Sequence, residues 1–378
     1  MATTGIISGR RFVLNPAARN ASPDAGLFAS QEMAEVAEFY RAMLGYSPTP
    51  LRSLGGYARE LGVRGLLVKD ESSRMGLNAF KIAGVAYALH RLRSSGALKP
   101  DSVLACATDG NHGRAVAHVA RELRLRAKIY IHSGASPARV QAIRDEGADV
   151  TIIDGNYDDS VRQVARDAQQ HGWTIVSDTA WPGYEQVPRD IMAGYTILMT
   201  EAAAQWGEPP EVVFVQAGVG ELAGAVASWL LQNFGADRPF LVCCEPENAA
   251  CVLESVRVGY PANLQGSLAT IMAGLSCGVV SSIAWPILLR SLDACVAISD
   301  DECRAAVRKL TYPNADDPSI TAGESGACGV ASLAAIMSCD DLHPVREALR
   351  LNSNSRVVAI NTEGATDPEA YRQITGHL

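Results

Sequence analysis

Apolar positions in this chain fall into short runs that alternate with stretches of helical periodicity. The apolar runs are typical of buried strands, and they lie at residues 102–108, 127–133, 149–154, 174–179, 211–217, 239–246 and 356–364. The helical patterns lie at residues 30–44, 82–89, 113–124, 136–147, 157–172 and 222–235. One helix has both ends marked: Ser136 is its predicted cap, Pro137 its first residue and Gly147 its end.

Strands that alternate with helices predict an α/β fold, with parallel sheets covered by helices on both faces. Right-handed crossovers then place the carboxyl ends of the strands, where ligands bind, at one edge of each sheet. We assign residues 84–191 to a smaller α/β domain, and residues 1–83 together with 192–378 to a larger one. The cleft between the two domains is the expected site.

Composition narrows the possible partners and the compartment. The chain has 378 residues, of which 48% are hydrophobic and 20% charged, as in an ordinary globular protein of two domains. Its net charge of −8 argues against general affinity for nucleic acid or anionic membranes. We expect no membrane span and no signal peptide, because long apolar runs are missing. Nine cysteines without a CxxC pair predict neither a disulfide framework nor a zinc site, and favour a reducing cytoplasm.

Lys81 stands at an unusual position, between a polar run at residues 69–78 and the small apolar helix at residues 82–89. A lysine placed there is either a surface residue whose long side chain reaches solvent or a base kept out of water. The first interpretation is the commoner one. The second depends on what the rest of the chain supplies.

Two turns have the character of anion-binding sites. The turn ATDGNHGRAV, residues 107–116, points backbone N–H groups and a helix N-terminus outward, as a carboxylate site requires. A plain turn capped by Asp109 or Asn111 explains it equally well. The stretch VFVQAGVGELAGAVASWL, residues 213–230, lets glycine backbone approach a phosphate. It has neither a P-loop nor a dinucleotide fingerprint, so a lone phosphate is the better interpretation.

A third loop, RVVAINTEGATD at residues 356–367, carries polar side chains at the end of a predicted parallel strand. Alone, it is explained by a strand-to-helix connection with Thr362 or Asp367 as a cap. Taken together with Lys81 and the two turns, it completes a set that pyridoxal phosphate needs: a Schiff-base lysine, a phosphate cradle and a partner for the ring nitrogen.

The chain resembles the fold-type II pyridoxal-phosphate enzymes, the group of threonine dehydratase and the tryptophan synthase β subunit. It resembles the diaminopropionate ammonia-lyase family more closely. The matching motifs are KDESSRMGLNAFK, TDGNHGRAVA, SDTAWPGY, QAGVGELAGAV, TIMAGLSCG, TAGESGACGV and INTEGATD. They follow the family's order from about residue 60 onward. The resemblance implies two α/β domains with the cofactor in the cleft between them, and a homodimer.

The resemblance also implies a role for each matching residue. Lys81 is expected to hold the cofactor, and Asn111 to lie beside its 3′-oxygen. The expected phosphate loop contains Gly218, Val219, Gly220 and Gly224, and Thr362 is expected to face the ring nitrogen. The substrate is expected to contact Thr108, Asp109, Gly110, Asn111, His112 and Asp178. We also expect burial to lower the pKa of Lys81, so that the amine is free to react.

The activity that the resemblance implies is elimination of ammonia from 2,3-diaminopropionate, a small amino acid, to give pyruvate. Asp109 and Asp178 are expected to attract its β-ammonium group. Lys81 would remove the Cα proton of the L-isomer and Asp109 that of the D-isomer. No metal is implied. A β-replacement synthase, or a lyase or dehydratase for another β-substituted amino acid, remains the alternative on this fold.

Two residues depart from the family pattern. Glu221 stands in the expected phosphate loop, where a carboxylate is unfavourable unless it points away or is paired. An outward-facing or helix-capping side chain and an altered cofactor or substrate contact are both consistent with it. Cys328 is expected to be a small buried residue. Two wider alternatives also remain: a silent amino-acid-binding protein, and a dinucleotide-dependent oxidoreductase.

Overall fold

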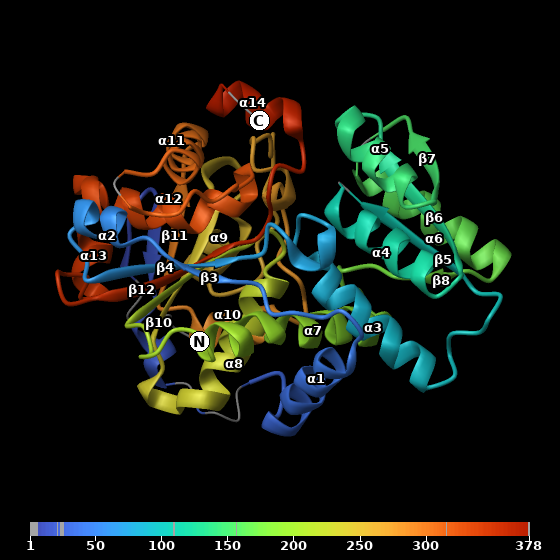
Figure 1. Ribbon diagram of the computed structural model, residues 1–378, viewed down its shortest axis with the longest axis horizontal. Coiled ribbons are helices and arrows are strands. Elements are labelled where there is room, and N and C mark those ends of the chain that lie inside the picture. The colour runs from blue at the N-terminus through green and yellow to red at the C-terminus, as the bar shows by residue number, and fades with distance from the viewer. Residues whose placement is uncertain are drawn as a thin grey trace.

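The computed structural model describes residues 7–20, 22, 26–108, 110–155, 157–314 and 316–376, and it folds around two sheets (Figure 1). The larger sheet has the strand order β1-β2-β11-β10-β9-β12-β4-β3. Its strands are β1 (Ile7–Ser8), β2 (Phe12–Leu14), β3 (Leu51–Ser53), β4 (Gly65–Asp70), β9 (Val212–Gln216), β10 (Phe240–Pro246), β11 (Ala294–Ile298) and β12 (Arg356–Asn361). The smaller sheet has the order β7-β6-β5-β8 and contains β5 (Val103–Thr108), β6 (Arg126–His132), β7 (Asp149–Ile153) and β8 (Thr174–Ile175).

Helices cover both sheets. The α-helices are α1 (Ser30–Ala42), α2 (Gly55–Leu61), α3 (Lys81–Ser94), α4 (Asn111–Glu122), α5 (Pro137–Asp145), α6 (Tyr157–His171), α7 (Gln186–Ala203), α8 (Glu221–Phe234), α9 (Cys251–Val258), α10 (Trp285–Ser291), α11 (Asp300–Thr311), α12 (Glu324–Ser338), α13 (His343–Ala348) and α14 (Pro368–Thr375). Short 3₁₀ segments include η3 (Arg74–Gly76) and η6 (Ala273–Leu275). In Figure 1 the smaller sheet, with α4, α5 and α6, stands apart from the larger lobe.

The predicted elements are confirmed, with two differences. The larger sheet is parallel only through its centre, because β2 pairs antiparallel with β11 at one side and β3 pairs antiparallel with β4 at the other. The strand predicted at residues 174–179 is shorter, since β8 ends at Ile175. The residues that follow leave the sheet, and this departure carries Asp178 toward the other lobe.

The predicted helix cap is present: the Ser136 hydroxyl accepts a hydrogen bond from the Arg139 N–H, and Pro137 opens α5.

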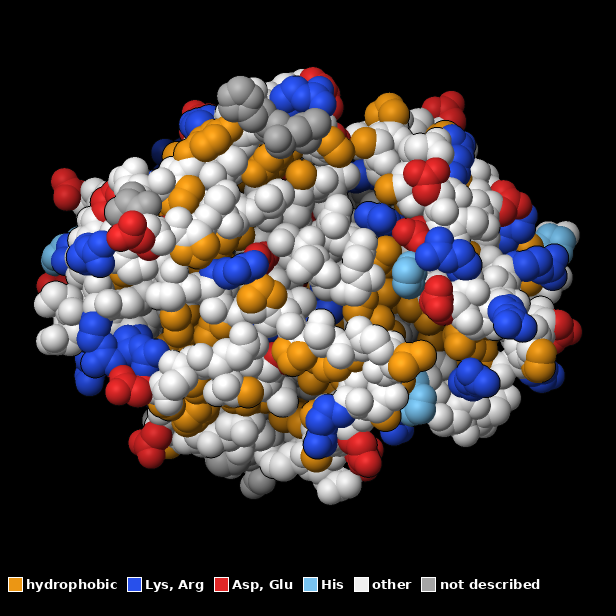
Figure 2. Space-filling view, viewed as in Figure 1, with side chains coloured by type: hydrophobic (Ala, Val, Ile, Leu, Met, Phe, Trp, Pro, Cys, Tyr) orange, Lys and Arg blue, Asp and Glu red, His pale blue; other side chains and the backbone are white. Residues whose placement is uncertain are grey.

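The cysteines also behave as predicted. None of the nine, all of which lie in the described part of the chain, is in a disulfide, and Cys328 is fully buried. None of the described helices is long and apolar enough to cross a membrane. Positive and negative side chains are interspersed on the face shown in Figure 2.

Candidate active site

The loop before Lys81 lies against the end of β12, although the two segments are far apart in the chain. The N–H of Glu71 donates to the carbonyl of Asn361 at 2.8 Å, and that of Phe80 donates to the carbonyl of Thr362 at 3.0 Å. Strands β4 and β12 are parallel neighbours, with Asp70 opposite Asn361 at their carboxyl ends. Parallel pairing therefore brings Lys81 to the sheet edge where ligands bind.

Helix α3 holds Lys81 in place by packing closely on α7. A Cβ on Gly194 would lie 2.4 Å from the carbonyl oxygen of Ala83, and one on Gly84 would lie 2.5 Å from the ring of Tyr195. Only glycine fits at these contacts. The Tyr40 hydroxyl also donates a hydrogen bond to the Ala83 carbonyl. The helix that the sequence predicts after Lys81 is thus buried, as expected from Ile82 to Leu89.

Lys81 and Asp178 form the central ion pair of the site. The Lys81 Nζ lies 2.6 Å from Asp178 Oδ2, and their side chains are 24% and 14% exposed. Burial lowers the pKa of Lys81, but the Asp178 carboxylate and the nearby Tyr195 and Glu221 raise it more, so the pKa lies above its ordinary value. The expected lowering is therefore wrong for this state of the protein, because the prediction lacked the carboxylate that pairs with the amine.

His112 is buried beside this pair, as a packed and hydrogen-bonded histidine. Its Nε2 lies 2.7 Å from the carbonyl oxygen of Val176, and its Nδ1 lies 3.6 Å from Asp178 Oδ2. Burial lowers the pKa of His112, which favours a neutral ring that donates from Nε2. Burial raises the pKa of Asp178, but His112 and Lys81 lower it more, so the pKa lies below its usual range.

In the turn between β5 and α4, two of the backbone N–H groups that were predicted to point outward are bonded within the turn itself. The Thr108 hydroxyl oxygen accepts from the N–H groups of Gly110 and Gly113 at 2.9 and 3.0 Å. Gly110 has φ +148, and a Cβ there would lie 2.9 Å from Arg139 Cδ. Thr108 thus shapes this turn. Asp109, the predicted second base, lies outside the described residues.

Asn111 opens α4, and its side-chain amide donates to the carboxylate of Glu363, just after β12. The second oxygen of Glu363 accepts from the N–H of Ser325 at 3.1 Å. The hydrogen bond from Asn111 joins the turn on the smaller sheet to the end of the larger one. The two predicted loops at residues 107–116 and 356–367 therefore face the same site.

The predicted phosphate loop connects β9 to α8. A Cβ on Gly218 would lie 2.9 Å from Cys277 Sγ and 3.1 Å from the Gly274 carbonyl oxygen. Gly220 has φ +94, a left-handed conformation that L side chains rarely adopt. The N–H of Ser281 holds the Val219 carbonyl at 2.7 Å. The loop is a close-fitting backbone turn that ends at a helix N-terminus, as an anion cradle requires.

The structure corrects the role expected of Gly224. This residue lies inside α8 and not in the loop, and a Cβ there would lie 2.9 Å from Met192 Cε and 3.4 Å from Ile287 Cγ2. Its lack of a side chain therefore lets α8 pack against α7 and α10. The predicted helix at residues 222–235 already contained Gly224, and its place in the phosphate loop came only from the resemblance.

Of the two interpretations left open for Glu221, the outward-facing side chain is wrong. It is 4% exposed. Its Oε1 accepts a hydrogen bond from the Ser281 hydroxyl at 3.1 Å. Burial and the charge of Asp178 raise its pKa well above the ordinary value. The carboxyl group therefore belongs to the site.

Thr362 lies buried at the end of β12, with its hydroxyl oxygen 2.8 Å from the Gln216 side-chain nitrogen that donates to it. The hydroxyl keeps its own proton to donate. Sequence reasoning missed Gln216, although it ends the apolar strand β9 just as Thr362 follows β12. It also missed Tyr195, whose position inside an apolar helix gives no local signal.

These residues fit pyridoxal phosphate. The structure brings together an amine on Lys81, a glycine-lined anion cradle at Gly218–Gly220 and a neutral hydroxyl on Thr362. The close packing at Gly218 and the left-handed backbone at Gly220 keep these two positions of the loop free of side chains directly before the N-terminus of α8, where a phosphate can bind.

Comparison with known proteins gives the same result. The family described as "Pyridoxal-phosphate dependent enzyme" matches residues 42–363. The chain belongs to this family. Its cofactor is accordingly pyridoxal phosphate.

Two relatives of this chain share one description. The diaminopropionate ammonia-lyase of Escherichia coli strain K12 is 40% identical over 364 residues, covering 91% of this chain and 92% of that protein. The enzyme of the same description from Salmonella typhimurium strain LT2 is 39% identical over 369 residues, covering 90% and 91%. The crystal structure of the holo E. coli enzyme superposes with a TM-score of 0.87 and covers 94% of this chain and 95% of that one. The present chain also shares its fold with tomato threonine deaminase isoform 2, at a TM-score of 0.75 and 21% identity.

Proposed function

We propose that this enzyme eliminates ammonia from 2,3-diaminopropionate and gives pyruvate and a second ammonia after hydrolysis. The Lys81–Asp178 pair carries the proposal, because it sets a basic amine beside a carboxylate that can accept a hydrogen bond from the β-ammonium group of the substrate. Similarity to the diaminopropionate ammonia-lyases over nine-tenths of the chain supports the substrate. A related E. coli structure is described as a complex with an aminoacrylate-PLP azomethine reaction intermediate, which supports elimination.

The bound cofactor supplies the electron sink that makes the Cα proton of an amino acid acidic. The residues of this chain do the rest. Lys81 removes the Cα proton of the L-isomer with its side-chain amine. Asp178 accepts a hydrogen bond from the β-ammonium group and holds it beside Lys81. The turn at Gly110 and Asn111 receives the substrate carboxylate at the N-terminus of α4.

Asp109 is proposed as the base for the D-isomer. A second related E. coli structure is described as a complex with D-serine, which supports testing both isomers. The cofactor contacts are proposed for Asn111, Gly218, Val219, Gly220 and Thr362. Thr108 and His112 act through their neighbours, since the first shapes the turn and the second packs against Asp178.

We also propose the wider organisation implied by the resemblance. Residues 84–191 form the smaller domain, and residues 1–83 with 192–378 form the larger one. The enzyme is a homodimer in the cytoplasm. The parallel sheet β5–β8 within the smaller range supports the division.

The decisive experiment measures pyruvate formation by the cofactor-loaded enzyme from L- and D-2,3-diaminopropionate. We expect activity with at least one isomer and its loss in Lys81→Ala. Asp109→Asn and Asp178→Asn form a matched pair: the first should impair the D-isomer selectively, and the second should raise KM for both. Cofactor binding without pyruvate from either isomer would contradict the substrate and turn attention to β-replacement with an added nucleophile.

A further inference from the structure

Glu221 is a buried carboxyl group that the proposed reaction does not use. It opens α8 directly after the glycine turn that forms the anion cradle. Ser281 pairs with one of its oxygens, Oε1, at 3.1 Å. The other oxygen, Oε2, is buried and has no hydrogen-bond partner among the residues that the structure describes. A buried polar atom without a partner calls for an explanation, because leaving it unpaired is unfavourable.

The surroundings of Glu221 show which way it faces. When ionised, Glu221 raises the pKa values of Lys81, Tyr184 and Tyr195. The charge of Asp178 raises the pKa of Glu221 and that of Lys81 lowers it. These groups come from α3, from α7 and from the loop after β8, so the Glu221 carboxyl group lies among the side chains around Lys81 and Asp178. In a helix the Cα–Cβ bond tilts toward the N-terminus, so the first residue directs its side chain to the end where an anion binds.

An ionised carboxylate at that end would repel a phosphate group. Among the described residues, Lys81 is the cation whose charge lowers the pKa of Glu221, but its amine is already paired with Asp178. A carboxyl group that keeps its proton behaves differently, because it becomes a hydrogen-bond donor. Burial raises the pKa of Glu221 well above its ordinary value, and the charge of Asp178 raises it further. Because Ser281 donates to Oε1, the proton belongs on Oε2.

We propose that Glu221 is a phosphate-binding residue that acts as a neutral acid, donating a hydrogen bond from Oε2 to a phosphate oxygen of the cofactor. The proposal rests on the cofactor described above. The backbone N–H groups of the loop hold the phosphate at every pH, but the Glu221 contact disappears when the acid ionises. The enzyme should therefore bind pyridoxal phosphate more weakly as the pH rises, through a titration that belongs to Glu221.

The test measures the dissociation constant of pyridoxal phosphate from pH 6 to 9 for the wild-type enzyme and for Glu221→Gln. A glutamine amide donates at every pH. We expect the ratio of the wild-type constant to the variant's to rise about tenfold across this range. Lys81, His112 and Asp178 also titrate in the pocket, and the charge of Glu221 shifts the pKa of Lys81, but that shift affects pyridoxal and pyridoxal phosphate alike. With pyridoxal, which lacks the phosphate, the ratio should therefore rise much less.

Two further variants sharpen the result. Glu324 opens α12 after Gly323 as Glu221 opens α8 after Gly220, and both glutamates are 4% exposed. Burial raises the pKa of Glu324 to about 7, so Glu324→Gln is a matched control that should leave the contrast between the two ligands unchanged. Ser281 lowers the pKa of Glu221. Ser281→Ala should therefore move the loss of affinity to higher pH.

A second readout comes from the phosphorus resonance of the loaded enzyme. Its chemical shift should titrate in the wild type and stay constant in Glu221→Gln. The proposal is overturned if both proteins show the same pH dependence, or if pyridoxal separates them as strongly as pyridoxal phosphate does. In those cases the cofactor assignment stands and only the role of Glu221 fails. If neither protein binds pyridoxal phosphate at any pH, the assignment and the proposal fail together.

Discussion

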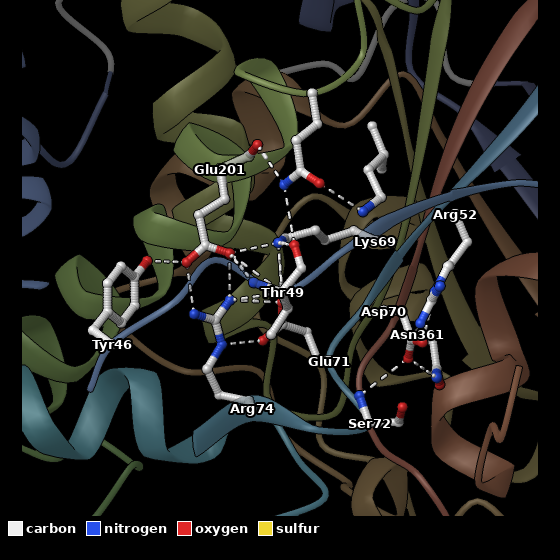
Figure 3. Close-up of polar contacts among 12 residues, drawn as sticks. Tyr46, Thr49, Arg52, Lys69, Asp70, Glu71, Ser72, Arg74, Glu201 and Asn361 are labelled. Carbon is white, nitrogen blue, oxygen red and sulfur yellow. Dashed lines mark hydrogen bonds and ion pairs between the residues drawn. The ribbon is translucent and has the colours of Figure 1, made fainter. Parts of the chain in front are cut away.

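Two clusters of buried charge meet at the loop of residues 71–80, and they differ in how fully their atoms are paired. The first, which we call the closed cluster, comprises Thr49, Lys69, Glu71, Arg74 and Glu201 (Figure 3). The second, the open cluster, comprises Lys81, His112, Asp178 and Glu221.

In the closed cluster two cations face two carboxylates. Arg74 donates to Glu71 at 2.6 and 2.8 Å and to Glu201 at 2.7 and 2.8 Å. Lys69 donates to the Thr49 carbonyl at 2.6 Å and to Glu201 at 2.5 Å. Lys69, Glu71 and Arg74 are fully buried. A cluster with this pairing has little capacity left for a ligand.

The open cluster keeps unused hydrogen-bonding capacity. His112 Nδ1 and Glu221 Oε2 are both buried without a hydrogen-bond partner among the described residues. Lys81 is partly exposed, which leaves the amine accessible. The difference teaches that burial of charge alone does not indicate a site. The closed cluster supports the loop that carries Lys81, and the open cluster is where a ligand completes the pairing.

The largest effect is expected from Lys81→Met in the open cluster. Loss of the proton-transferring base alone should reduce kcat by about 10²–10⁴-fold. The unfolding free energy should change much less, because Lys81 and Asp178 both reach solvent. Pyruvate assays together with urea denaturation check both statements. If Lys81→Met lowered the unfolding free energy as strongly as Arg74→Met does, the separation between the two clusters would be contradicted.

Arg74→Met should break the closed cluster. It leaves Glu71 and Glu201 buried without their main partner, which is expected to cost about 3–5 kcal/mol of unfolding free energy. Urea denaturation measures the loss. An unchanged midpoint would show that the pairing seen here contributes nothing to stability. Activity per folded molecule should fall less than in Lys81→Met, because Arg74 acts only through the loop.

Asp178→Asn should sharpen the electrostatic part of the comparison. The Asp178 carboxylate raises the pKa of Lys81, so its removal lets burial lower that pKa. Lys81 would then lose its proton at lower pH. The rate at which the cofactor attaches to the cofactor-free protein should therefore reach its plateau at a pH about one to three units lower. Stopped-flow absorbance against pH measures this. A profile that moves to higher pH would refute the assigned sign.

The smallest effect is expected from Arg64→Met, a surface counterpart of Arg74→Met. Arg64 contacts Glu208 at 2.6 Å, but the two side chains are 50% and 70% exposed. Exposed pairs of this kind contribute about 0.2–1 kcal/mol. The same urea experiment therefore compares arginine–glutamate contacts at the surface with those in the buried closed cluster. Equal losses for Arg64→Met and Arg74→Met would mean that burial does not decide the difference.

Much of the site could be predicted because its signals are local. Lys81 before a small apolar helix, the glycine turn at Gly218–Gly220 and the turn at Gly110 are all visible within short windows. Gly224 was placed in the phosphate loop by the resemblance alone, although the predicted helix at residues 222–235 already contained it. The pKa of Lys81 was expected to fall because of burial alone. That expectation was wrong because no local pattern shows that Asp178 lies 2.6 Å from the Lys81 amine.

The sequence by itself determined the fold class, the strands and helices that it predicted, and the residues that offer an amine, an anion cradle and a hydroxyl. These follow from periodicity, turn chemistry and motif spacing, which act between near neighbours in the chain. Only the tertiary structure decided that Glu221 is buried, that Lys81 pairs with Asp178, and that the edges of the larger sheet are antiparallel. Those outcomes depend on which distant segments meet when the core packs, and local patterns do not record such meetings.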